Sequence, residues 1–151
     1  MKKAERIATF VDQLGAPSDP ALDPRYAGFF QCFNDQRYYE AHDVLEHLWL
    51  QTTDENHRYF KGLIQIAGAF VHLQKQFLRP LHPKDGRRLR PAVRLFQLSM
   101  NNLESYRPHH LRFDVEALLR LCEKLSDEIV ASDFQKNPWH PDRAPRIGLM
   151  S

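Results

Sequence analysis

The stretch YFKGLIQIAGAFVHLQKQFL, residues 59–78, gives the clearest indication of the fold. Its apolar residues recur every three or four positions, which is the spacing of one face of an α-helix. Thr53 and Asp54 precede the stretch and are good capping residues, so the pattern predicts one long helix ending near Leu78. The apolar stripe of this helix consists of Phe60, Leu63, Ile64, Ala67, Phe70, Val71 and Phe77.

Segments upstream of this stretch repeat the helical spacing. An apolar face over residues 7–14 predicts a first helix that Gly15 can end. Asp23-Pro24 has the form of a capping residue followed by a first-turn proline, which predicts a second helix reaching Phe33. A third helix is expected over about residues 36–51.

The downstream half predicts two more helices and a tail. One helix is expected over about residues 85–106, with Pro91 either kinking it or marking its first turn, and another after Asp114 as its cap. No segment of useful length alternates with the period of a strand. The sequence therefore predicts an all-α fold, a single compact bundle of about six helices. We expect residues 1–136 to form this bundle and residues 137–151 to be a proline-rich tail packed on its surface.

Composition excludes several classes of protein. The 151 residues are 42% hydrophobic and 26% charged, with a net charge of +2, which suits one globular domain and gives no field for nucleic acid. The longest uncharged stretch, Gly62 to Gln74, is shorter than the roughly 20 apolar residues that span a bilayer. The two cysteines, Cys32 and Cys122, form no C-x-x-C motif. We therefore expect a cytoplasmic protein with reduced thiols and no membrane partner, and the composition does not favour a nucleic-acid partner.

The third helix carries the residues with the most chemistry. His42 and Glu46 are four positions apart and so lie side by side on one helical face. A carboxylate beside an imidazole can bind a divalent metal, act as an acid–base pair, or hold the histidine in one tautomer. We expect a polar cluster between the third and fourth helices that binds a small molecule or an anion. Its candidate residues are Tyr39, Glu40, His42, Glu46, Trp49 and Gln65.

Two alternatives remain open for this cluster. The first is a metal-dependent hydrolase in which His42 and Glu46 are ligands, His72 is the third ligand, and Glu40 or Asp43 is the base. A divalent metal would then be the cofactor. The second is a structural or interaction protein, in which the same side chains form a buried hydrogen-bonded network that fixes how the helices pack.

A basic stripe is the only hint of a nucleic-acid or phosphate ligand. Arg87, Arg90 and Arg94 can line one face of the fifth helix, and arginine binds phosphate oxygens through two hydrogen bonds. No nucleic-acid motif accompanies the stripe, so a solvated helix face is the preferred interpretation. His109-His110 next to Pro108 is interpreted as an exposed turn.

The run FNDQRYYEAHDVLEHLW, residues 33–49, resembles the signature of an uncharacterised family, the domain-of-unknown-function family three hundred and nine. The fourth-helix residues YFKGLIQIA and His72 resemble its second block, so the resemblance covers about residues 26–105. Gln36 stands where glycine is frequent, and Asp43 replaces the usual glutamate. The resemblance implies a compact α-helical fold found in prokaryotes and plastid-bearing lineages, and it brings no established activity.

Overall fold

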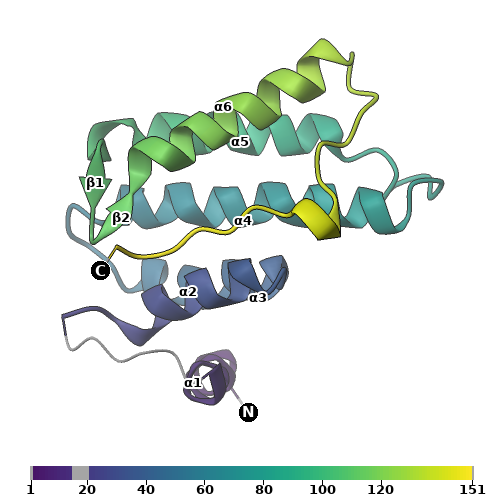
Figure 1. Cartoon of the computed structure of the whole chain (residues 1–151). Helices are drawn as coiled ribbons and strands as arrows, with labels where there is room; N and C mark the ends of the chain where they lie inside the picture. Colours follow the sequence, from purple (N-terminus) through teal and green to yellow (C-terminus); the bar gives the residue numbers. More distant parts are fainter. Residues whose placement is uncertain (1, 15–20, 151) are drawn as a thin grey trace.

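The structure, a computed structural model, describes residues 2–14 and 21–150. Within this part of the chain, six α-helices form a bundle, which confirms the predicted all-α fold (Figure 1). The helices are α1 (Lys3–Leu14), α2 (Pro24–Asn34), α3 (Tyr38–Leu50), α4 (His57–Leu78), α5 (Leu89–Leu103) and α6 (Val115–Ala131). The shorter elements are the 3-10 turns Glu104–Tyr106 and Pro141–Arg143 and the strands β1 (His109–His110) and β2 (Phe113–Asp114).

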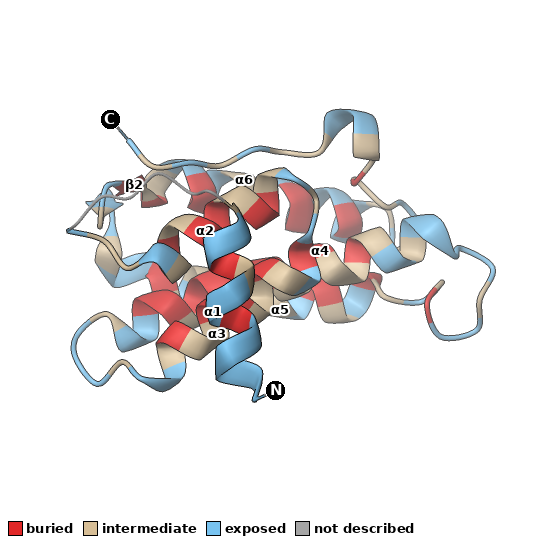
Figure 2. Cartoon of the chain, turned by 90° about the horizontal axis from the view of Figure 1, so that it is seen from below, coloured by how far each residue is buried: buried red, intermediate tan, exposed pale blue. Residues whose placement is uncertain are grey.

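Helix α4 lies at the centre of the bundle. It packs between α3 and α5, while α2 covers α3 and α6 covers α5 (Figure 1). Helix α1 crosses α2 and α3 from outside, and its N-terminal turns are largely exposed (Figure 2). None of the helices in the described part of the chain has the length and apolar character needed to cross a membrane.

Local capping signals set several helix starts. The side chain of Asp23 accepts a hydrogen bond from the backbone nitrogen of Arg25, and that of Asp114 accepts one from Ala117, as predicted. Helix α4 differs, because it begins at His57 after a turn in which Asp54 accepts from the nitrogen of Asn56. Thr53 and Asp54 therefore precede the helix without capping it. Gly15, the predicted end of α1, lies outside the described residues.

Helix α5 begins at Leu89, later than predicted. Pro91 consequently falls in its first turn, where the missing N–H leaves no hydrogen bond unmade. The side of α4 that carries Gly62 lets α5 approach closely, since a Cβ at Gly62 would lie 2.6 Å from Cγ of Leu103. The hydroxyl of Ser99 donates to the carbonyl of Gly62 at 2.9 Å across this contact.

The turn between α2 and α3 depends on Gln36, which has a φ of 61°. This left-handed conformation favours glycine, the residue that the resemblance leads one to expect at this position. In this chain, Gln36 is held by two hydrogen bonds. Its side-chain amide donates to the backbone carbonyl of Pro141 at 2.8 Å, and its backbone carbonyl accepts from the side-chain amide of Gln74 at 3.0 Å. These bonds offset the strain of a non-glycine residue.

The C-terminal segment runs across the bundle over α4 (Figure 1). Trp139 is 4% exposed, and its indole nitrogen donates to the hydroxyl of Tyr38 at 3.0 Å. Further along, the side chain of Asn34 exchanges hydrogen bonds with the backbone nitrogen and carbonyl of Ile147. These contacts fasten the segment to α2 and α3.

Candidate functional site

Helix α3 has two chemically different faces. The apolar spacing of Tyr38, Ala41 and Leu45 turns these residues to the interior, where each is 0% exposed. His42 and Glu46 lie to one side of that stripe, so their side chains are 32% and 31% exposed. The predicted pair is therefore at the surface of α3 and outside the core between α3 and α4.

His42 is held between two carboxylates. Its Nδ1 lies 3.3 Å from Oδ1 of Asp43, and its Nε2 lies 3.8 Å from Oε2 of Glu46. The ring stacks on Tyr39, with ring centroids 6.5 Å apart, although Tyr39 itself is 62% exposed. Oε1 of Glu46 also forms an ion pair with Nζ of Lys3 on α1, at 3.5 Å. The helical spacing thus brings His42 and Glu46 together, and α1 adds a cation to the pair.

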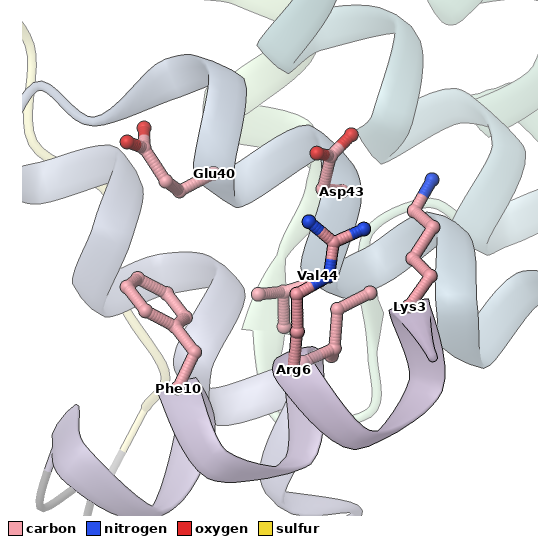
Figure 3. A pocket seen from close by; sticks show the side chains of 7 residues that line it. Lys3, Arg6, Phe10, Glu40, Asp43 and Val44 are labelled. Carbon is pink, nitrogen blue, oxygen red and sulfur yellow. The ribbon is translucent and has the colours of Figure 1, made fainter. Parts of the chain in front are cut away.

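A cleft of about 240 Å³ opens beside this group, between α1 and α3 (Figure 3). One wall carries the carboxylates of Glu40 and Asp43, and the opposite wall carries the cations Lys3 and Arg6. The floor is apolar. It consists of Ile7, Phe10 and Val44.

Two of the four charges facing this cleft are already paired. Asp43 contacts His42, and Lys3 contacts Glu46. The side chains of Glu40 and Arg6 form no hydrogen bond or ion pair with another residue in the described ranges. The cleft therefore presents one carboxylate and one guanidinium that can each pair with a bound molecule.

Gln65 and Trp49 have other partners than the predicted cluster. Gln65 accepts a hydrogen bond from Asn102 of α5 at 2.8 Å. The Trp49 ring stacks on His57, with centroids 4.9 Å apart, and Nζ of Lys61 lies 4.5 Å from the Trp49 centroid. Its buried indole nitrogen has no hydrogen-bond partner among the residues that the structure describes. The structure therefore brings Tyr39, His42 and Glu46 together, places Glu40 on the wall of the neighbouring cleft, and leaves Gln65 and Trp49 in separate contacts.

His72 is not brought to His42 and Glu46. Its Nδ1 accepts from the guanidinium of Arg88 at 3.1 Å, at the end of the bundle where α4 leads into α5. Burial, followed by the nearby charge of Arg88, lowers the pKa of His72, which favours the neutral acceptor. In residues 2–14 and 21–150, no group of three or more His, Cys, Asp or Glu side chains is placed to hold a metal ion. In the described part of the chain, the predicted third ligand therefore does not join His42 and Glu46.

The basic stripe does not follow one helical face as predicted. Arg87 precedes α5, because that helix begins only at Leu89. The guanidinium of Arg90 lies over the ring of Phe134 at 4.0 Å, and Arg94 is exposed. Of the two loop histidines, His109 is exposed, whereas His110 is part of the β1–β2 hairpin and packs 4.6 Å from Tyr59 and 4.8 Å from Tyr106, measured between ring centroids.

The sequence reasoning missed the contribution of α1. Lys3 and Arg6 are three positions apart, and Ile7 and Phe10 follow at helical spacing, so one helix face carries cations beside apolar residues. That pattern was available in the sequence. The sequence alone does not show that this face of α1 covers the carboxylates of α3.

A second cleft, of about 270 Å³, lies against residues of α1 that include Ala8, Val11 and Asp12. Here Arg25 is held by both carboxylate oxygens of Asp23 and by Nδ1 of His47 at 2.7 Å. Burial and then the charge of Arg25 lower the pKa of His47. Every cation that lines this cleft already has a partner. This cleft therefore has fewer charged groups available to a ligand than the first cleft has.

Comparison with known families matches residues 26–81 to a domain of unknown function (DUF309). The match confirms the predicted family, over a shorter range than the resemblance suggested. No curated protein and no solved structure matches the chain. The matched segment runs from α2 through α4, so it contains Glu40, His42 and Glu46, whereas Lys3 and Arg6 come from α1 outside it.

Proposed function

We propose that this protein binds a small zwitterionic molecule in the cleft between α1 and α3. Glu40 would pair with a cationic group of the ligand, and Arg6 with an anionic group. The apolar part of the ligand would lie on Ile7, Phe10 and Val44. The observation that carries the proposal is the presence of these two oppositely charged groups, without ion pairs among the described residues, across one apolar floor.

The magnitudes of the interactions fit selective and moderate binding. A hydrogen bond to a charged group contributes about 1.5–3 kcal/mol, and solvent reduces that value here because Arg6 is exposed and Glu40 is partly exposed. We therefore expect each charge of the ligand to be worth roughly tenfold in affinity. The apolar floor contributes to any ligand with a hydrocarbon body and does not distinguish its charges.

Three matched molecules test this proposal. The ω-amino acid ε-aminocaproate carries both charges on a short hydrocarbon chain, whereas caproate lacks the ammonium group and hexylamine lacks the carboxylate. We expect ε-aminocaproate to bind about tenfold more tightly than either of the other two, measured by amide chemical-shift titration. The shifts should centre on α1 and the first half of α3.

Two variants assign the ends of the ligand. Glu40→Gln should remove the preference for ε-aminocaproate over caproate, and Arg6→Gln should remove the preference over hexylamine. Glu123→Gln, an exposed position on α6, is the matched control and should leave both preferences unchanged. Equal affinities for the three molecules in the wild-type protein would contradict a zwitterion site.

The competing function is purely structural, with the charges serving only to attach α1. The ion pair between Lys3 and Glu46 favours it, because that pair joins the two helices directly. In that case Glu40→Gln and Arg6→Gln would change the melting temperature at most, and none of the three molecules would shift resonances in the cleft.

We also propose that the protein works in the cytoplasm as one helical domain, residues 1–136, with residues 137–151 as a surface tail. Two free, buried cysteines support a reducing compartment. Burial raises the pKa of the Cys32 thiol to about 11, so this thiol is protonated and unreactive at neutral pH.

A further inference from the structure

The connection between α4 and α5 carries the most exposed large apolar side chain among the described residues. Leu81 is 96% exposed and Leu78 is 68% exposed, while Phe77 beside them is 36% exposed. Phe77 and Leu78 lie in the last turn of α4 and Leu81 in the connection after it, which extends from one end of the bundle (Figure 1). We call residues 75–88 the Leu81 tip. Apolar side chains grouped at such a projection indicate a contact surface.

A polar network fixes the Leu81 tip in place. Asp85 is 9% exposed, and its carboxylate accepts hydrogen bonds from Arg79 and Arg88, each at 3.0 Å. Nδ1 of His82 accepts from the backbone nitrogens of Lys84 and Asp85. A Cβ at Gly86 would overlap the carbonyl oxygen of Pro80, so the turn requires glycine there. Leu81 is thus held in solvent by bonds among its neighbours.

The exposed charges of the Leu81 tip all have one sign. Asp85 is the sole acidic residue between positions 75 and 88, and it is buried and paired. The exposed charged side chains are Lys75, Arg79, Lys84 and Arg87. The tip therefore combines projecting leucines with a basic surround, and its charge is complementary to an anionic partner.

We propose that the Leu81 tip binds an anionic lipid surface, with Leu78 and Leu81 in the interfacial layer and the four basic side chains against the headgroup phosphates. This arrangement binds from one side of the membrane and needs no spanning helix. Charge complementarity favours an anionic occupant. The shape favours lipid over protein, because the leucines project from a convex end and a protein partner would have to supply a matching apolar pocket.

Vesicle co-sedimentation tests the proposal. The full chain is mixed with vesicles of phosphatidylcholine, or of phosphatidylcholine with about one-third phosphatidylserine. We expect binding to the anionic vesicles alone, and a steep loss of binding as salt screens the headgroups. The double variant Leu78→Ser with Leu81→Ser should weaken this binding at least about tenfold. Lys84→Glu with Arg87→Glu should weaken it to a similar extent.

Leu50→Ser is the matched control, because Leu50 is 67% exposed but lies at the end of α3, outside the tip. It should bind vesicles like the wild type. Circular dichroism melts check that each variant is folded, which we expect because the substituted side chains are exposed.

Several outcomes would overturn the proposal. No binding to anionic vesicles is one, and binding that survives the double serine substitution is another, since it would be adsorption by charge alone. Retention on polyglutamate beads without vesicle binding would identify an acidic protein as the partner. Self-association of the wild type that the serine substitutions abolish, without vesicle binding, would identify a second copy of the chain.

Discussion

The inner and outer faces of α3 differ in how they are determined. The inner face packs Tyr38, Ala41 and Leu45 into the continuous core that α2, α4 and α5 share. The outer face carries His42, Asp43 and Glu46, and α1 reaches it through a small separate apolar cluster of Ile7, Val11 and Val44. Apolar packing determines the inner face. The outer face carries the charged side chains that this packing excludes from the core.

This difference explains why a cleft forms on the outer side. Tightly packed cores leave few voids. The α1–α3 contact has only a small apolar cluster to close it, so space remains between the charged side chains on either side. Stability is therefore concentrated on the inner face of α3, whereas the cleft proposed to bind a ligand lies on the outer face.

The largest expected effect tests the inner face. Leu45→Ala should lower the free energy of unfolding by roughly 2–5 kcal/mol, because it removes a fully buried side chain and leaves a cavity. Chemical denaturation measures the change. Leu50→Ala on the same helix, at a position that is 67% exposed, should change the free energy by less than about 0.5 kcal/mol. Similar losses for both variants would remove the distinction between the faces.

A smaller effect concerns the buried hydrogen bond at the N-terminal end of α3. Tyr38→Phe removes the acceptor of the Trp139 indole and leaves a buried donor unpaired, which should lower the free energy of unfolding by roughly 1–3 kcal/mol. The companion variant Trp139→Phe, alone and combined with Tyr38→Phe, forms a double-mutant cycle. Strictly additive losses would mean that the hydrogen bond contributes nothing of its own.

The outer face should tolerate a change that the inner face does not. His42→Ala should alter the free energy of unfolding by less than about 0.5 kcal/mol, because the side chain is partly solvated and its carboxylate partners remain hydrated. Thermal melts at neutral pH measure this. A loss of roughly 1–3 kcal/mol would instead indicate the buried polar network that the sequence left open as an alternative.

The smallest expected effect is a pH dependence at His47, where α3 meets Arg25. The pKa of His47 is lowered from 6.5 in the folded protein, so the unfolded chain binds the proton more readily. The stability that neutral His47 contributes is thus complete above that value and is lost as the pH falls through it. Between about pH 7 and about pH 5, His47→Gln should lose less stability than the wild type. Parallel pH profiles for the two proteins would contradict the assignment.

The sequence predicted what local chemistry determines. The caps at Asp23 and Asp114 act within a few residues of themselves, and the pairing of His42 with Glu46 follows from helical spacing alone. The amphipathic stripes likewise predicted the helices and their number. Each of these features is decided by neighbours in the chain, so no knowledge of the packing was needed.

The candidate site depended on long-range contacts, which the sequence did not specify. Gln65 and His72 were expected beside His42, but Asn102 and Arg88 of the α5 region bind them instead. Their side of α4 faces α5 because Gly62 lets Leu103 approach, whereas α3 meets another side. The cleft was missed for a similar reason, since α1 meets α3 through a cluster that has three buried apolar residues in the described part of the chain.

Trp139 has a consequence for how this protein can be followed in solution. Its ring lies 5.4 Å from that of Phe77 in the Leu81 tip and 6.1 Å from that of Tyr38 on α3, measured between centroids. A single indole therefore joins the tail, the start of α3 and the tip. In a Trp49→Phe background, its fluorescence is an intrinsic optical reporter, which detachment of the tail would shift to the red as water reaches the ring.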